Sequence, residues 1–242
     1  MAININRVYK SVLVVLQQEK RGVLTPTEFN KVATQAQQEI FIEYFDELNQ
    51  LLRQPQTSLA YADRYALLDE KIQIFKRTEN LQTDAASKVT PTVAVQELGS
   101  VIYFSTSASE GREAQRIQQY EVFTTNQSPL TAPSERYPVY TYENNVIQLY
   151  PTSIGVPSPV FNNVQLNFLK YPSDVKWGFT IDTELGNYIY NEQSSVNFEL
   201  HQSDEPLLVD KILGYAGVMT RDQLALQLAA GKEQQIDIDG QK

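Results

Sequence analysis

Residues 25–52 read TPTEFNKVATQAQQEIFIEYFDELNQLL, and this stretch decides the fold. Thr25 is suited to cap a helix, Pro26 suits the first helical position, and Glu28 can reach back to complete a capping box. Apolar side chains then recur at three- and four-residue steps, which places them on one face of a helix. The stretch therefore predicts a helix of roughly 28 residues, about 40 Å long, that ends before Pro55.

Three further segments share this helical periodicity. The first covers residues 5–22 and closes on a glycine, and another covers residues 59–77. The last begins at Ser203, a suitable cap, continues to about residue 231 and is followed by a polar tail. These segments predict a helical bundle in which the last helix packs back on the first three.

A change to two-residue alternation marks a β-rich region between the third helix and the last. Its clearest signal is a hairpin over residues 137–150 with an asparagine-rich turn, and further strands are expected at 101–104, 164–169 and 196–200. We therefore expect an α+β fold, in which a β-rich domain is inserted into a bundle of three N-terminal helices and a C-terminal helix. The expected boundaries are 1–80 for the helical part, 81–202 for the β-rich domain and 203–242 for the closing helix and tail.

The composition excludes several classes of protein. The 242 residues include 20 Lys and Arg, 29 Asp and Glu, one His and no Cys, for a formal net charge of −9. Disulfides, thiolate metal sites and thiol nucleophiles are therefore impossible, and the net charge argues against a nucleic-acid clamp. The start of the chain is polar, and its most apolar stretch, residues 12–16, is far shorter than a membrane span. We expect no signal peptide and no membrane contact.

The usual catalytic templates each lack a part. No Gly-x-Ser-x-Gly elbow, Gly-x-Gly-x-x-Gly loop or phosphate-binding loop occurs, and the single histidine, His201, is expected to be structural. We therefore predict no enzyme activity, no cofactor and no metal site. The remaining catalytic alternative is a pair of carboxylates among Glu184, Glu192 and Glu199, with Trp177 stacking on a sugar.

Acidic residues are concentrated near the end of the chain. Between Lys176 and Lys211 there are seven carboxylates and no basic residue. This pattern indicates either a solvated acidic surface or a surface that repels a nearby polyanion. The candidates for a DNA-repelling surface are Asp182, Glu184, Glu192, Asp204 and Glu205.

The residue content also favours a protein that works through polar interfaces. The chain has 24 Gln and 14 Tyr, residues well suited to wet protein–protein contacts. Tyr188 and Tyr190 are interface candidates because they share one side of a short strand. A proline-rich loop supplies three more candidates, Pro151, Pro157 and Pro159.

Packing and turn motifs are spread along the chain. In the N-terminal half they are Gly22-x-x-Thr25-Pro26-x-Glu28-Phe29-Asn30, Ala36-Gln37-x-Glu39-Ile40-Phe41 and Tyr44-Phe45. In the remainder they are Tyr137-Pro138-Val139-Tyr140, Tyr150-Pro151, Lys170-Tyr171-Pro172, Trp177, residues 207–213 and Ala216-Gly217. These motifs resemble those of a virion protein of the crAss-like and related short-tailed bacteriophages. The resemblance covers nearly the whole chain and carries no chemical signature, so it names no individual functional residue.

The resemblance implies a ring protein of the head–tail connector. Such a protein is made in the host cytoplasm and assembles, commonly as a dodecamer, below the portal protein and against neighbouring ring or tail proteins. Double-stranded DNA passes through the ring without specific binding, and the acidic composition agrees with this expectation. The alternative is a ligand- or glycan-binding β-module of a virion or cell-surface assembly, which would expose an aromatic cluster around Trp177.

Overall fold

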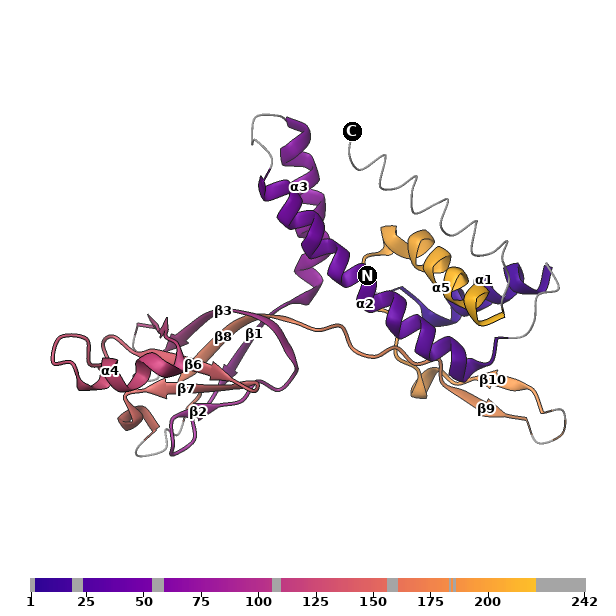
Figure 1. Ribbon diagram of the computed structural model, residues 1–242. Helices are drawn as coiled ribbons and strands as arrows, with labels where there is room; N and C mark the ends of the chain where they lie inside the picture. The colour runs from indigo at the N-terminus through magenta and orange to yellow at the C-terminus, as the bar shows by residue number, and fades with distance from the viewer. Residues whose placement is uncertain are drawn as a thin grey trace. The chain divides into compact units, whose positions relative to one another are not determined.

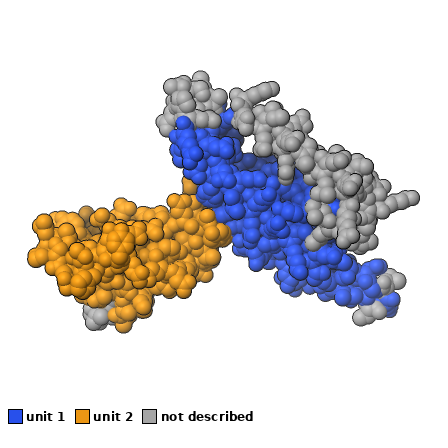
Figure 2. All heavy atoms as spheres, in the orientation of Figure 1, with its two compact units in different colours: residues 1–74, 172–242 blue, residues 75–171 orange. Residues whose placement is uncertain are grey.

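The computed structural model describes residues 3–18, 24–53, 59–105, 110–155, 161–182, 184 and 186–220. Its class is α+β, as expected, with helices early and late in the chain and strands between them. The chain forms two compact units, which Figure 1 shows as a ribbon and Figure 2 in two colours. Residues 1–74 and 172–242 make the helical unit, and residues 75–171 make the β-rich unit.

Helix α2, Pro26–Arg53, is the long helix that the sequence predicts. Its first turn holds the expected capping box, because the Thr25 N–H donates to Glu28 Oε2 at 2.9 Å and the Glu28 N–H donates to Thr25 Oγ1 at 3.4 Å. Hydrogen bonds from Thr25 hold the pKa of Glu28 below its usual value. One face of α2 is buried from Phe29 to Leu51, so the helix forms the central support of its unit.

Three other helices pack around α2 or its neighbours: α1 (Ile5–Gln18), α3 (Leu59–Ile72) and α5 (Glu205–Thr220). The contact between α2 and α5 includes a buried cation, since Lys211 Nζ lies 2.8 Å from Glu43 Oε1 and 3.5 Å from Glu39 Oε1. The Tyr215 hydroxyl adds a hydrogen bond to Glu39. The closing helix therefore packs back on the N-terminal helices, as predicted.

Two helix ends differ from the expected ones. Helix α3 ends at Ile72 rather than at residue 77, because a short turn, η1 (Gln73–Phe75), leads into strand β1 (Lys76–Leu81). Helix α5 begins at Glu205, after turn η5 (Gln202–Asp204). The imidazole of His201 caps turn η5 by accepting from the Ser203 N–H, a structural role of the kind expected for this histidine. Ser203 lies inside that turn and, contrary to what the sequence suggested, does not directly precede α5. The expected end of this helix and the polar tail lie outside the described residues.

A polar stripe on α2 holds the part of the chain that returns from the β-rich unit. Asn30, Thr34 and Gln37 bond to the backbone of residues 173–177. Gln37 is fully buried, and its Nε2 donates to the Ser173 carbonyl at 2.8 Å. Its Oε1 accepts from the Glu199 N–H at 2.9 Å, so one amide side chain joins two chain segments to α2.

The β-rich unit consists of two four-stranded sheets that share one core. One sheet has the order β1-β8-β3-β4 and is antiparallel throughout. The other has the order β2-β7-β6-β5 and contains one parallel pair, β5 with β6. The remaining strands are β2 (Lys88–Val89), β3 (Val95–Tyr103), β4 (Arg112–Glu113), β5 (Gln115–Arg116), β6 (Val139–Glu143), β7 (Val146–Tyr150) and β8 (Val164–Lys170).

The predicted hairpin is confirmed as β6 and β7, and its turn has the expected chemistry. Asn144 and Asn145 both have positive φ, 48° and 61°, which asparagine tolerates better than most residues. In the other sheet a register irregularity in β3 brings Gly99 against β8. A Cβ at Gly99 would lie 2.9 Å from the Asn167 carbonyl oxygen, so this position requires glycine.

The two units divide the chain at different residues from those we expected. The β-rich unit begins at Phe75 and ends at Tyr171, where the sequence suggested 81 and 202. The second boundary lies earlier in the chain than expected because the polar stripe on α2 binds residues 173–177 to the helical unit. The expected strand at 196–200 is reduced to single-residue bridges, Val196 with Lys176 and Phe198 with Ile3, since the Glu199 N–H donates to Gln37 instead.

Replacement of Gln37 by alanine should destabilise the helical unit. The change leaves the Ser173 carbonyl and the Glu199 N–H, both partly buried, without their Gln37 partners, at a cost of about 2 kcal/mol in the free energy of unfolding. Urea denaturation followed by the fluorescence of Trp177, which lies in this unit, measures the loss. The exposed neighbour Gln38→Ala is the control and should change the free energy by less than about 0.5 kcal/mol. Equal stability of the two variants would contradict the role of Gln37.

Candidate interaction surfaces

A short β-hairpin projects from the helical unit, and we call it the hairpin arm. It comprises β9 (Phe179–Ile181), β10 (Tyr188–Tyr190) and the described residues as far as Glu192. Tyr188 pairs with Ile181 and Tyr190 with Phe179, so these four side chains share one face of the arm. Tyr188 and Tyr190 therefore lie on one side of a strand, as the sequence indicated. Among the described residues, β9 and β10 pair only with each other.

The arm is attached through a chain of aromatic rings. Trp177 is 4 % exposed, and its ring centroid lies 4.4 Å from that of Tyr9 on α1. On the arm side its ring lies 5.6 Å from Tyr190 and 6.0 Å from Phe179. Phe179 in turn contacts Tyr188 edge to face at 5.1 Å. Ring contacts of this kind stabilise a hairpin that would be marginal alone.

Polar contacts fix the base of the arm. The Asn30 side chain accepts from the Trp177 backbone N–H at 2.7 Å, and Trp177 Nε1 donates to Asn6 at 3.2 Å. A Cβ at Gly178 would lie 2.8–2.9 Å from backbone atoms of Ser194 and Asn191, so glycine is needed there as well. Because the Trp177 ring is buried, it does not form the exposed aromatic cluster that the glycan-binding alternative requires.

The outer part of the arm exposes apolar side chains on both faces. Ile181 is 60 % exposed and Tyr188 is 47 % exposed on one face, and Ile189 is 52 % exposed on the other. The exposed carboxylates of Glu184 and Glu192 lie in the same segment, with no cation among residues 177–210. An exposed apolar ribbon with an acidic rim is typical of a protein–protein contact rather than of a solvated surface.

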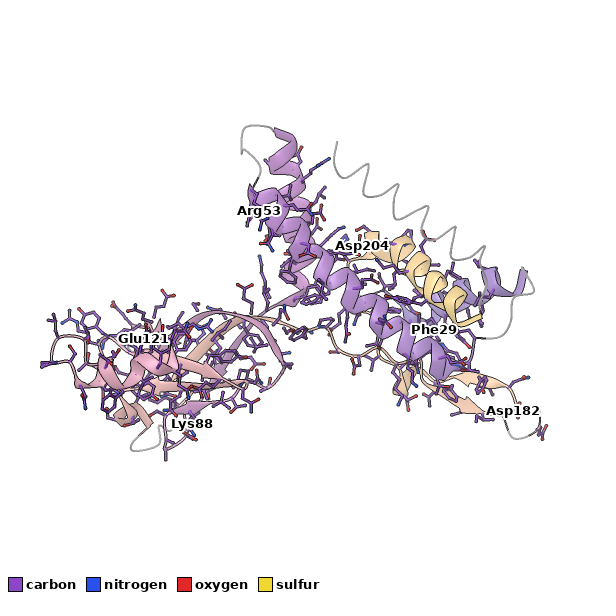
Figure 3. The ribbon with its side chains drawn as sticks, viewed as in Figure 1. Phe29, Arg53, Lys88, Glu121, Asp182 and Asp204 are labelled. Atoms are coloured by element: carbon purple, nitrogen blue, oxygen red, sulfur yellow. The ribbon has the colours of Figure 1, made fainter. Side chains whose placement is uncertain are left out.

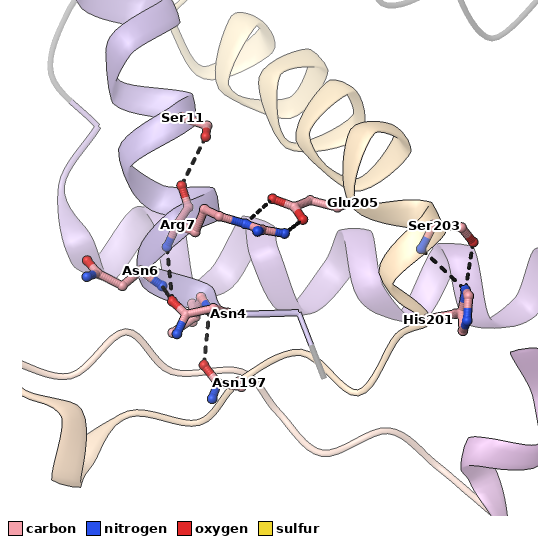
Figure 4. Close-up of polar contacts among 9 residues, drawn as sticks. Asn4, Asn6, Arg7, Ser11, Asn197, His201, Ser203 and Glu205 are labelled. Atoms are coloured by element: carbon pink, nitrogen blue, oxygen red, sulfur yellow. Dashed lines mark hydrogen bonds and ion pairs between the residues drawn. The ribbon is translucent and has the colours of Figure 1, made fainter. Parts of the chain in front are cut away.

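The five acidic candidates do not form one surface. Figure 3 shows Asp182 at the far end of the arm and Asp204 among the helices. Asp204 is buried, accepts from the Tyr44 hydroxyl and pairs with Lys71 Nζ at 2.8 Å. Glu205 pairs with the Arg7 guanidinium, whose Nε lies 2.7 Å from Oε1 (Figure 4). Asp204 is therefore internal and Glu205 is held in a surface ion pair, whereas the other three candidates are exposed or partly exposed and all lie on the arm.

The one proline candidate among the described residues, Pro151, lies in the β-rich unit. Pro151 follows β7 in the β-rich unit, and its carbonyl accepts from the Ile154 N–H at 3.1 Å at the start of turn η3 (Thr152–Gly155). It is half-buried. Pro157 and Pro159 lie outside the described residues. The structure therefore brings Tyr188 and Tyr190 together with the arm acids but does not bring them together with Pro151 in one compact unit.

A second exposed apolar segment, which sequence reasoning missed, covers residues 119–137 of the β-rich unit. It contains turn η2 (Gln119–Glu121) and helix α4 (Val122–Gln127). Its exposed large side chains are Tyr120, Phe123, Leu130 and Tyr137, with exposed fractions of 69–94 %. The sequence of this segment shows neither helical nor alternating periodicity over more than a few residues. Its isolated large side chains are therefore the only feature of the sequence that could have indicated an exposed apolar surface.

An open polar hollow of about 870 Å³ lies in the β-rich unit between residues 82–90, the hairpin β6–β7 and the 119–122 turn. Its two carboxylates serve the fold, since Asp84 accepts the N–H groups of Ala86 and Lys88 and Glu143 accepts from Gln119. Within the described ranges no group of three His, Asp or Glu residues could hold a metal ion. In the same ranges no helix is long and apolar enough to span a membrane.

Comparison with known proteins does not assign a family. No family model matches this chain, and no curated protein matches its sequence. The hairpin arm and the 119–137 segment are therefore interpreted from their own geometry and chemistry.

Substitutions on the two faces of the arm should affect stability differently. Tyr190→Ala removes a ring that contacts Trp177 and should lower the free energy of unfolding of the helical unit by about 1–2 kcal/mol. Ile189→Ser alters an exposed side chain and should change it by less than about 0.5 kcal/mol. Chemical denaturation of both variants tests the assignment. A large loss for Ile189→Ser would show that this face is part of the fold.

The buried hydroxyl of Tyr44 should make stability fall at high pH. Burial first, and then the hydrogen bond to Asp204 and its charge, raise the pKa of Tyr44 above the ordinary value near 10. Below about pH 10 the Tyr44 hydroxyl keeps its proton in both the folded and the unfolded state, so its contribution to stability is complete. Above it only the unfolded state loses the proton, so stability falls by up to about 1.4 kcal/mol per pH unit from this group.

The variant Tyr44→Phe isolates this contribution. It should be less stable than the parent chain at pH 8, because Asp204 loses a buried donor, and the difference should shrink between pH 10 and pH 11. Burial also raises the pKa values of Tyr9 and Tyr215 in the same unit, and the comparison cancels their effect. Denaturation curves that stay parallel over this pH range would contradict the assignment.

Proposed function

We propose that this protein is a structural virion subunit that forms a ring, commonly a dodecamer, in the head–tail connector below the portal of a short-tailed bacteriophage. The observation that carries the proposal is the hairpin arm, which exposes apolar side chains on both faces and has an acidic rim. The placement of the ring in the head–tail connector is supported by the sequence motifs that resemble those of crAss-like phage connector proteins. The ring would extend the channel for packaging and ejection of double-stranded DNA.

A ring requires that one surface of each copy meet a different surface of the next copy. The arm is suited to be the first surface, because it projects and leaves apolar area uncovered within its own chain. A connector must also contact the portal and the neighbouring ring or tail proteins. The exposed 119–137 segment gives the chain a second apolar surface, in the other compact unit, for such a contact.

The charge of the chain supports passage of DNA without binding. A net charge of −9 per copy gives a closed ring a strongly negative total charge, which disfavours phosphate contacts. Of the five carboxylates considered for the channel wall, Asp204 is buried and paired with Lys71, and Glu205 pairs with Arg7 at the surface of the helical unit. Asp182, Glu184 and Glu192 belong to the same hairpin arm as exposed Ile181 and Tyr188, a placement that favours the rim of a contact over a bare channel wall.

Light scattering of the purified chain, alone and mixed with the portal protein of the same virion, tests the proposal. We expect either a ring of about a dozen copies or stoichiometric capture by the portal. Ile189→Ser should weaken assembly while leaving the fold intact, and Gln38→Ala should leave both unchanged. A chain that stays monomeric and ignores the portal contradicts the proposal.

A further inference from the structure

The contact that joins adjacent copies is indicated by the distribution of charge and exposed apolar residues within the helical unit. We infer that the hairpin arm of one copy docks on the outer face of α1 of a second copy. The inference rests on the proposed ring for its biological setting, but its physical basis is independent of that setting. The binding partner of the arm is then the N-terminal helix of another copy of this chain.

The charges of the two segments are opposite. Helix α1 carries two cations, Arg7 and Lys10, and no carboxylate, and Lys10 is the exposed one that is left after Arg7 pairs with Glu205. The hairpin arm carries three carboxylates, Asp182, Glu184 and Glu192, and no cation. Opposite net charges on two surfaces of one chain steer copies toward a specific contact and disfavour contacts between like surfaces.

The exposed side chains of α1 match those of the arm in chemistry. Tyr9, Val12 and Leu16 are buried against the rest of the unit. The outer face presents Lys10 and Val14, one helical turn apart, with Val14 52 % exposed. This face is apolar with a positive charge, whereas the arm is apolar with a negative rim.

The chain's own arm leaves Val14 of its own α1 open. Among the described residues, Trp177 at the base of the arm contacts Tyr9 and Asn6, which lie in the first turns of the helix. Val14, Ile181 and Ile189 each keep more than half of their side-chain surface exposed within one copy. Two apolar surfaces of opposite charge that remain open in the same copy can be buried together when a second copy binds.

The absence of cysteine from the chain allows a direct cross-linking test. One chain carries Val14→Cys and a second chain, distinguished by a larger affinity tag, carries Ile189→Cys. The two are mixed, oxidised with copper phenanthroline and separated without reductant. The control replaces the first chain with Leu67→Cys, because Leu67 on α3 is 61 % exposed and has the same opportunity for random collision. Trp177 fluorescence verifies that each variant is folded.

We expect at least ten times more disulfide-linked heterodimer from Val14→Cys than from Leu67→Cys. The Lys10→Glu change in the Val14→Cys chain should reduce the yield, and Asp182→Lys with Glu184→Lys in the Ile189→Cys chain should restore it. Equal yields from the two cysteine positions, or no heterodimer, overturn the inference. Yields that do not respond to the charge reversals also overturn it, because charge complementarity is part of the claim.

A single chain with both Val14→Cys and Ile189→Cys separates this inference from the proposed function. A ladder of linked products that extends to about twelve copies supports both. A product that stops at the dimer supports the contact and contradicts the ring, since it indicates a two-fold exchange of arms. Rings that form under light scattering without Val14–Ile189 linkage support the proposed function and overturn the docking inference.

Discussion

The helical unit depends on one buried side-chain amide. Gln37 lies on the long central helix and bonds at the same time to the Ser173 carbonyl and the Glu199 N–H, so the chain that returns from the β-rich unit is fixed at two points. A buried amide left without partners would cost several kcal/mol, which makes this arrangement specific. Asn30 extends the same stripe and binds the backbone of Trp177.

The hairpin arm follows from that constraint. Because residues 173–177 are held against α2, the next residues leave the unit at a defined point, and Gly178 allows the tight approach to residues 191 and 194. The aromatic rings from Tyr9 to Tyr188 then support two three-residue strands that no other strand covers within the described chain. The interior of the unit thus positions a projecting element whose exposed residues are available to a partner.

Sequence patterns predicted the parts of the fold that are governed by local rules. The capping box at Thr25 and Glu28, the periodicity of α2 and the asparagine turn between β6 and β7 all appear in the structure. Edge strand β1 was missed because its outward residues are polar, and residues 196–200 were misassigned because their backbone partners are side chains distant in sequence. That Tyr188 and Tyr190 share one face of a strand was predictable from their spacing. The partners of Asp204, which are Tyr44 and Lys71, and the partner of Glu205, which is Arg7, were not predictable because they are distant in the sequence.

The central claim is that identical copies of this chain assemble into a closed ring through the arm. Electron microscopy of the purified oligomer tests it most directly, because class averages report both closure and symmetry. The claim predicts closed rings of about a dozen copies, with a projecting element of each copy in contact with its neighbour. Two-fold dimers, open filaments or isolated monomers, observed with the 242-residue chain at high protein concentration and in the presence of the portal protein, would contradict it.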